Sequence, residues 1–524
     1  MRRPAVGVLA FPLLFVVLGV SCSADRDTRQ AIGSAPGLDP RLDEIRGFLV
    51  REIGDGTVPS VAIAVAHGGE IVWEEAFGWA DREGELGATP HTTYRLGSIS
   101  KPITATALMR LAQTGLIDLD APIERYLGGL SLRYYEGSRD EVTVRRVLQH
   151  RAGLPSYDQV FYLDEEVERR SFAETVRRYG IVAFEPGWSF VYSNLGYMLL
   201  ARAVEVATGF DFAPFVRDSV FAPLGMGTAQ VYAAGDELLG PAATPYYGIS
   251  GEPVPRSVYA YPGSADVYCS AHALLRFAMF HLGDHLPDQR LVLADSTIEA
   301  MQRQEPPSNT RYGLGWSFDV DDLGFRSVYH GGQETGVSNF MVLVPSEDLA
   351  VVILTNSDYD ADRLLHIQGA VRAALIPGYD GRNPWALMAP ETAEAGPDTA
   401  GAPPEEQMPT RTFPEEMLGT WEGRIVAYNM EIAALLVLSD DGGTVRLSDG
   451  EVVPVDFSIV SSGFLLGTFA GSIPTPDMAR YDDRVRLALR LTGDRLAGQA
   501  TAVGWREDRQ THTEQSAWIE LERH

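Results

Sequence analysis

Between about Leu38 and Pro377 the hydrophobic pattern switches between the period of strands and the period of helices. Ser60–Ala66 and Ile71–Phe77 are apolar runs separated by two glycines, a pattern that predicts a β-hairpin. Helical patterns follow at Asn194–Ala207, Ala271–Leu282 and Asp360–Ala374. Three more strand-like runs come late in this part of the chain, at Ser327–Tyr329, Phe340–Val344 and Ala350–Leu354. One antiparallel sheet that shares N-terminal and C-terminal strands, with a helical insertion between them, accounts for this order.

The C-terminal part of the chain has a different pattern. Met388–Pro414 is rich in Pro, Ala, Glu, Thr and Gly and has little hydrophobic period, which predicts a linker. Beyond it, turn residues separate short alternating runs at Leu435–Leu438, Phe464–Phe469, Val485–Leu491 and Ala517–Leu521. These runs predict a small all-β domain, a barrel or a sandwich. We expect a signal segment at 1–24, a first domain at 25–378, a linker at 379–414 and a second domain at 415–524.

The first residues have the pattern of an export signal. Two arginines precede the apolar stretch Ala5–Val20, which is short for a membrane span. The segment that follows resembles a bacterial lipoprotein signal, in which Cys22 becomes the lipidated first residue. Gly19 departs from that pattern, and ordinary cleavage beyond Ala24 is the alternative. Both interpretations predict an exported protein, either periplasmic, anchored to the membrane through its lipid, or secreted.

Composition narrows the class of protein. The 524 residues are 45% hydrophobic and 22% charged, which is ordinary for a globular protein. With 71 acidic against 43 basic residues the formal net charge is -28, which argues against nucleic acid as a partner. The two cysteines are Cys22 and Cys269, so no intrachain disulfide is expected after processing, and Cys269 is expected to be a small buried residue.

Lys101 is the only lysine among these 43 basic residues. It begins a stretch that predicts a helix to about Thr114, and Ser98 lies three positions before it, a spacing that places both side chains on one helix face. Arginine serves every other basic position, but arginine cannot lose its proton at accessible pH, whereas a desolvated lysine can. The pair therefore suggests a nucleophilic serine beside a proton acceptor. Taken alone, Ser98 is also compatible with a helix cap, and an isolated Ser-x-x-Lys is a weak signal.

Two further segments strengthen this interpretation. Tyr192–Asn194 comes just before a predicted helix, and His330–Gly332 ends a predicted strand. In this order, Ser98–Lys101 and these two segments resemble the three motifs of the serine β-lactamase and penicillin-binding-protein superfamily, in the form found in class C β-lactamases and related esterases and D-aminopeptidases. Other stretches that fit the resemblance are Leu116–Pro122, Leu148–Pro155 and Tyr312–Trp316.

The resemblance covers about Leu38–Pro377 and implies an α+β fold of the β-lactamase/transpeptidase type. Such a fold has an antiparallel sheet flanked by helices, with a helical subdomain. The small all-β domain that follows resembles the lipocalin-like barrel extensions of some members. That second likeness is one of architecture and carries no motif, so no function transfers with it.

The resemblance also implies a role for each motif residue. Ser98 would attack an acyl carbon and form an acyl-enzyme. Lys101 and Tyr192 would activate it, and which of the two is the base stays open. Tyr192 would then protonate the leaving group, and Asn194 would hydrogen-bond Lys101 and the substrate. The oxyanion would lie on the backbone amides of Ser98 and Gln333.

The third motif departs from the usual pattern of the superfamily. β-Lactamases and cell-wall carboxypeptidases carry Lys-Thr-Gly or Lys-Ser-Gly there, and the cation and hydroxyl grip a substrate carboxylate. Here His330 replaces the lysine, and glycines, Gly332 among them, fill the rest of the motif. Loss of a charge-assisted contact costs about 1.5–3 kcal/mol. This argues against an efficient β-lactamase and favours an esterase or aminopeptidase.

The sequence therefore predicts a serine hydrolase that acts through an acyl-enzyme on small esters, amides or peptides. The alternatives are a β-lactamase or D-Ala-D-Ala carboxypeptidase, and a non-catalytic binding lipoprotein that keeps the fold, against which the retained Lys101 speaks. The expected partners are a small-molecule or peptide substrate and, through Cys22, the membrane. No cofactor is expected. His281 and His285 have the spacing of two zinc ligands, but the sequence offers no obvious third ligand, so a metal site is not predicted there.

Overall fold

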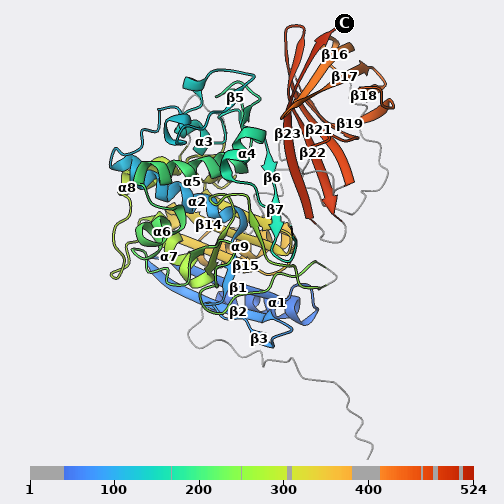
Figure 1. Cartoon of the computed structure of the whole chain (residues 1–524). Helices are drawn as coiled ribbons and strands as arrows, with labels where there is room; N and C mark the ends of the chain where they lie inside the picture. Colours follow the sequence, from blue (N-terminus) through green and yellow to red (C-terminus); the bar gives the residue numbers. More distant parts are fainter. Residues whose placement is uncertain are drawn as a thin grey trace, which may run out of the picture.

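The computed structural model describes residues 40–166, 168–248, 251–303, 310–379, 413–461, 464–475, 482–506 and 511–524 (Figure 1). The predicted signal segment with Cys22 lies outside this part of the chain, as do residues 380–412 of the predicted linker. No helix within the described ranges is long and apolar enough to cross a membrane.

A seven-stranded antiparallel sheet forms the centre of the first unit. Its strand order is β12-β13-β14-β15-β1-β2-β3, so strands from both ends of the unit share one sheet, as predicted. The strands are β12 (Ser317–Val320), β13 (Arg326–Glu334), β14 (Val337–Val344), β15 (Leu349–Thr355), β1 (Ser60–His67), β2 (Glu70–Asp81) and β3 (Leu86–Gly87). The pairing of β1 with β2 confirms the predicted hairpin.

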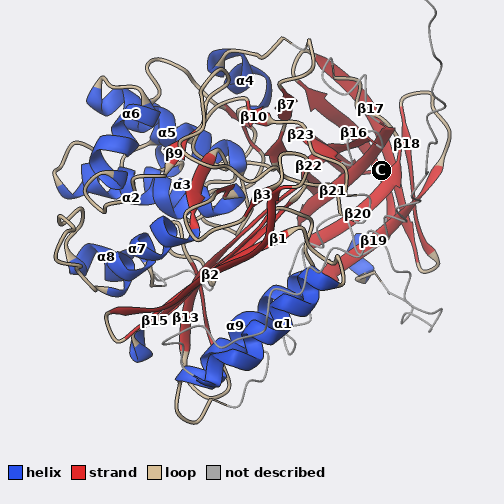
Figure 2. Ribbon diagram, turned by 90° about the horizontal axis from the view of Figure 1, so that it is seen from below, coloured by secondary structure: helices blue, strands red, loops and turns tan. Residues whose placement is uncertain are grey.

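Helices cover both faces of this sheet (Figure 2). Alternate residues of β1 divide between the two layers: Ile63 and Val65 belong to the core beneath α1 (Asp43–Gly54) and α9 (Ala361–Leu375), whereas Ala62 and Ala64 belong to the opposite core. The opposite layer contains α2 (Ser100–Gln113), α3 (Val144–Leu148), α4 (Phe172–Tyr179), α5 (Asn194–Thr208), α6 (Phe212–Val216), α7 (Ala271–Leu282) and α8 (Asp295–Met301). The predicted α+β class with a helical subdomain is thereby confirmed.

Short strands connect this helical layer to the sheet. β4 (Thr93–Arg95), β11 (Val267–Ser270) and β9 (Gln230–Val231) form a three-stranded sheet, and two-stranded pairs join β7 (Val160–Tyr162) to β10 (Ser257–Tyr259) and β5 (Arg133–Tyr134) to β8 (Ile181–Val182). Cys269 on β11 is fully buried and not in a disulfide.

The C-terminal unit is a closed barrel of consecutive antiparallel strands. They are β16 (Gly419–Ala427), β17 (Met430–Ser439), β18 (Gly442–Leu447), β19 (Val453–Ser461), β20 (Phe464–Ala470), β21 (Asp482–Thr492), β22 (Arg495–Arg506) and β23 (Thr511–Arg523). β16 pairs with both β17 and β23, which closes the barrel. Trp421, Leu436 and Leu465 are among the fully buried residues of its core. Of the two predicted architectures, the structure has the barrel.

The barrel also pairs with the first unit through a single short strand. β16 pairs with β23 only from Trp518 onward, so β16 does not cover this edge of β23 in the first half of the strand. β6 (Tyr157–Asp158) occupies that edge, opposite Glu514 and Gln515. Both views show the barrel beside this part of the helical layer (Figures 1 and 2). The strand addition therefore links the barrel to the segment that follows the stretch Leu148–Pro155.

An apolar contact lies beside this pairing. Trp518 of the barrel stacks on Tyr135 of the first unit, with ring centroids 4.4 Å apart and an angle of 9° between the planes. Phe184 packs with Ala488 and Ala497 in the same buried cluster. The barrel is thus held by buried side chains as well as by main-chain pairing.

Candidate active site

The structure brings Ser98 and Lys101 together at the start of α2. Ser98 lies in the 3-10 turn Gly97–Ile99, which continues directly into α2. One helical turn separates the two residues, and Lys101 Nζ lies 3.0 Å from Ser98 Oγ. A neutral amine at this position can take the proton of the serine hydroxyl.

Lys101 is completely buried, and its surroundings make a neutral amine accessible. Nζ also donates to the carbonyl oxygen of Ser264 at 3.1 Å, and it lies 4.6 Å from the centre of the Tyr192 ring. Burial lowers the pKa of Lys101 to about 7, although the charges of Asp158 and Glu334, among others, act in the opposite direction. The amine therefore changes charge near neutral pH, which its ordinary pKa would not allow.

The second motif lies at the start of α5. Ser193 caps this helix, because its Oγ accepts from the backbone amide of Gly196. Asn194 is the first helical residue, and its Oδ1 is buried with no hydrogen-bond partner among the described residues. The hydrogen bond expected between Asn194 Oδ1 and Lys101 is therefore not formed, whereas Lys101 Nζ donates to the Ser264 carbonyl oxygen, a partner that was not predicted. A main-chain carbonyl has no sequence signal, so the pattern could not reveal this contact.

The third motif lies inside β13 and does not end it, contrary to the sequence prediction. Gly332 pairs with Asn339 of β14, and the strand continues through Gln333 to Glu334. A Cβ added at Gly332 would lie 1.9 Å from the Leu96 carbonyl oxygen, so the strand passes in direct contact with the chain that leads to the serine turn. Glycine is a poor strand former, but this close approach requires it.

The same contact brings together the two segments that carry the amides predicted to hold the oxyanion. Gly97, directly before Ser98, has a φ of +56°, and a Cβ there would lie 3.1 Å from the backbone nitrogen of Gln333. The turn that carries Ser98 and the strand that carries Gln333 are therefore in van der Waals contact. Two backbone amides from adjacent segments suit an acyl oxygen that becomes negative during attack.

His330 is a neutral, buried part of the site. Nδ1 lies 2.7 Å from the Gly331 carbonyl oxygen and must donate to it, so Nε2 accepts from the Tyr312 hydroxyl at 3.1 Å. Burial, followed by the nearby Lys101 charge, lowers the pKa of His330 to about 3. The side chain that replaces the family's lysine thus supplies no positive charge at neutral pH.

His150 belongs to the site although the sequence assigned it no role. Its ring centroid lies 4.3 Å from that of Tyr192, and its Nδ1 accepts from the backbone amide of Ser193 at 3.0 Å. Its φ is +55°, which is uncommon for a residue other than glycine. The available signal was its place in the stretch Leu148–Pro155. We assign His150 a positioning role, because it holds the second motif against Lys101.

The two histidines with zinc-like spacing have separate partners. Nε2 of His281 is buried 3.0 Å from the Thr106 hydroxyl, and Nε2 of His285 lies 2.9 Å from an Asp295 carboxylate oxygen. In the described ranges, no group of three or more His, Cys, Asp or Glu side chains is arranged to hold a metal ion.

Comparison with known proteins identifies the family. The family described as Beta-lactamase matches residues 45–375, so the chain belongs to the β-lactamase family of serine hydrolases. The esterase EstB of Burkholderia gladioli is 32% identical over 381 residues, which cover 62% of this chain and 92% of the esterase. A penicillin-binding protein of Bacillus subtilis (strain 168) is 26% identical over 327 residues, which cover 57% of this chain and 68% of that protein.

A solved structure extends the likeness in fold beyond this family domain. The octameric penicillin-binding protein homologue from Pyrococcus abyssi matches with a TM-score of 0.53 at 20% identity, over 90% of this chain and 100% of that one. The predicted membership of the superfamily and the predicted serine hydrolase class are confirmed.

Proposed function

We propose that this serine hydrolase cleaves small esters, amides or peptides through an acyl-enzyme on Ser98, with Lys101 as the base. The observation that carries the proposal is the 3.0 Å contact of Lys101 Nζ with Ser98 Oγ in a setting that lowers the lysine pKa to about 7. The related esterase EstB of Burkholderia gladioli supports an ester substrate.

In the acylation step the bond between Ser98 Oγ and the acyl carbon forms while the hydroxyl proton moves to Lys101 Nζ. The acyl oxygen becomes negative on the amides of Ser98 and Gln333. The bond to the leaving group then breaks, and that group takes up the proton held by Lys101, with Tyr192 beside the amine as the proton relay. Water attacks the acyl-enzyme by the same route in reverse and restores the serine.

The neutral His330 is the reason to favour esters and amides over β-lactams and D-Ala-D-Ala peptides. A substrate carboxylate placed at the third motif would meet an uncharged ring whose Nδ1 and Nε2 already serve Gly331 and Tyr312. It would therefore lack a charge-assisted contact worth about 1.5–3 kcal/mol. Substrates without that carboxylate lose nothing at this position.

The test is hydrolysis of p-nitrophenyl acetate by the full chain and by Ser98→Ala and Lys101→Arg. Both variants are expected to lose at least about a thousandfold in kcat, because one lacks the nucleophile and the other a base that can be neutral. Ser264→Ala is the matched control, since it removes a hydroxyl with no hydrogen-bond partner among the described residues and keeps the carbonyl that contacts Lys101. Ester hydrolysis that survives Ser98→Ala would refute the proposal, and faster cleavage of a chromogenic cephalosporin than of the ester would favour the β-lactamase alternative.

A further inference from the structure

An aromatic cluster borders the amine of Lys101 on the side of the second motif. The ring centroid of His150 lies 4.3 Å from that of Tyr192 and 4.9 Å from that of Tyr312. Lys101 Nζ lies 4.6 Å from the centre of the Tyr192 ring. The group that returns its proton to the leaving group is therefore bordered by aromatic rings.

Phe190 adds an exposed ring to this cluster. Its centroid lies 5.5 Å from that of His150, 5.6 Å from that of Tyr312 and 6.4 Å from that of Tyr192, which are distances of aromatic contacts. His150 and Tyr312 are buried, whereas Phe190 is 38% exposed. The cluster thus presents apolar surface to solvent through Phe190, and burial of that surface by a ligand is favourable.

The chain that carries Phe190 is held from two sides. The amide of Val191, the next residue, donates to the His150 carbonyl oxygen at 2.7 Å. Two residues before Phe190, Trp188 contacts the barrel, because the Arg490 guanidinium lies 4.5 Å from the centre of its ring. The exposed ring is therefore preorganised, so a ligand does not have to order this segment when it binds.

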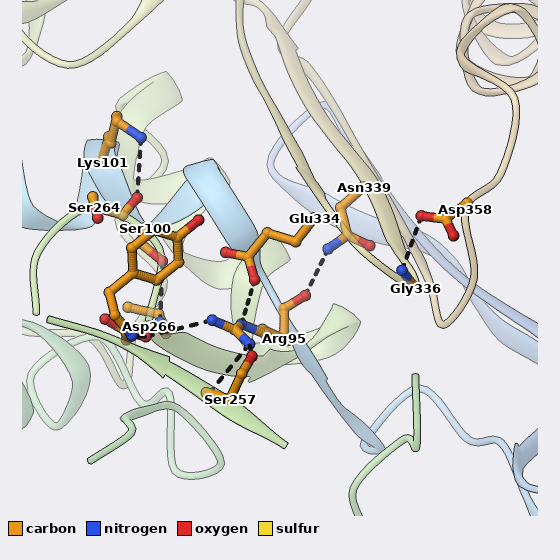
Figure 3. Close-up of polar contacts among 12 residues, drawn as sticks. Arg95, Ser100, Lys101, Ser257, Ser264, Asp266, Glu334, Gly336, Asn339 and Asp358 are labelled. Carbon is orange, nitrogen blue, oxygen red and sulfur yellow. Dashed lines mark hydrogen bonds and ion pairs between the residues drawn. The ribbon is translucent and has the colours of Figure 1, made fainter. Parts of the chain in front are cut away.

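The segment that follows the predicted oxyanion donor is charged instead. Glu334 comes directly after Gln333 on β13, and its Oε2 lies 2.7 Å from Arg95 Nε. Arg95 Nη2 lies 3.5 Å from Asp266 Oδ1, so these largely buried side chains pair with one another (Figure 3). Charged groups thus follow the segment expected to hold the acyl oxygen, whereas aromatic rings surround the residues that move the proton.

We propose that Phe190, Tyr192 and Tyr312 form an aromatic subsite that binds an aryl group on the leaving group of the substrate. The inference rests on the proposed function and narrows its substrate class to esters and amides of aryl-bearing alcohols and amines. The leaving group has to lie beside Lys101 and Tyr192 to take up its proton, and Phe190 is the exposed ring next to Tyr192. An aryl group there can pack edge-on or offset against Phe190.

The aromatic subsite offers rings to this occupant. The Tyr312 hydroxyl donates to His330 Nε2 at 3.1 Å, and burial lowers the pKa of that histidine to about 3, so the ring stays uncharged. A charged leaving group would lose hydration against these rings, whereas an aryl group gains from burial.

The experiment compares benzyl acetate with ethyl acetate by pH-stat titration of the full chain. The two esters share the acetyl group, and their alcohols have similar acidity, so the comparison reports the binding of the leaving group. The expected result is a kcat/KM at least about tenfold higher for the benzyl ester. In Phe190→Ala this ratio should fall at least about fivefold, and Phe190→Leu, which keeps apolar volume without a ring, should give an intermediate ratio.

Phe210→Ala is the matched control. It removes a phenylalanine ring that is 66% exposed, just beyond the end of α5 remote from the second motif, and should leave the ratio unchanged. If Phe190→Ala does not fold, the ratio of Phe190→Leu decides in its place. A ratio near one in the wild type, or a ratio that neither Phe190 variant changes, would overturn the aromatic subsite.

Two further substrates separate the remaining outcomes. Ethyl phenylacetate carries the ring on the acyl part, and a preference for this ester that Phe190→Ala removes would overturn the assignment to the leaving group. p-Nitrophenyl acetate reports the proposed function in the same samples. Its hydrolysis with a benzyl-to-ethyl ratio near one refutes this inference alone, whereas its failure refutes the proposed function.

Discussion

The carbonyl oxygen of Leu96 lies against the Cα of Gly332, so closely that no side chain fits between the serine turn and β13. Gly332→Ala would force its Cβ to 1.9 Å from that oxygen, and the strand would have to move away from the turn. We expect kcat for p-nitrophenyl acetate to fall at least about a hundredfold, since displacement of one oxyanion donor costs about that much.

Gly331→Ala is the neighbouring control for this prediction. Its Cβ would find its nearest atom, the Asn339 carbonyl oxygen, at 3.8 Å, which is an ordinary contact. This variant should keep kcat within about threefold of the wild type, because surface-like changes without a clash are nearly neutral. Equal losses in both variants would show that the close approach at Gly332 does not set the geometry of the site.

The pH dependence of hydrolysis should reveal the lysine. Because the pKa of Lys101 is lowered to about 7, the amine is protonated below that pH and cannot accept the Ser98 proton. We expect kcat/KM for p-nitrophenyl acetate to fall about tenfold per pH unit below pH 7 and to reach a plateau above it. A profile that stays flat down to pH 5 would exclude Lys101 as the base.

The lowered pKa of Lys101 should also be visible in the pH dependence of the free energy of unfolding, independently of catalysis. The unfolded lysine keeps a pKa near 10.5 and binds a proton more tightly than the folded one, so burial of Lys101 costs stability at low pH. That cost is fully present below pH 7 and disappears as the pH rises to 10.5. Lys101→Met should therefore be more stable than the wild type at pH 6, by on the order of 5 kcal/mol at most.

Urea unfolding of the wild type and Lys101→Met at pH 6 and pH 10 measures this difference. The advantage of the variant should shrink at the higher pH as the wild type gains stability. An advantage that is the same at both pH values would mean that the lost charge is not its source.

The contact between barrel and helical layer should be a large contributor to stability. Trp518 is 5% exposed and stacks on Tyr135, so Trp518→Ala should lower the free energy of unfolding by about 3 kcal/mol. Val452→Ala, at a barrel residue that is 60% exposed, is the control and should change it by less than about 0.5 kcal/mol. Similar values for the two variants in urea unfolding would contradict a stabilising contact at Trp518.

Sequence analysis predicted the parts of this molecule that depend on short spacing. Ser98 and Lys101 meet because one helical turn joins them, and the β1–β2 hairpin follows from two apolar runs with a glycine turn between them. The order of the three motifs was enough to indicate the family, since its fold brings them together.

Contacts between distant segments could not be predicted in this way. The Ser264 carbonyl reaches Lys101 across 163 positions, and a main-chain oxygen looks the same at every residue. Arg95, Glu334 and Asp266 are ordinary charged residues in the sequence, and only the fold buries them together. The prediction for the third motif was wrong because two glycines suggest the end of a strand, whereas the close approach of Leu96 requires a glycine at Gly332 within the strand.

The strand addition between β6 and β23 has a consequence for how such proteins diversify. Strand pairing uses main-chain N–H and C=O groups, and every residue except proline, which lacks the N–H, supplies both. A different barrel could therefore replace this one and still hold the segment with Asp158, provided that its last strand begins with a free edge of similar length. This pairing is therefore compatible with exchange of the whole barrel, and such an exchange would leave Ser98 and Lys101 in the first unit unchanged.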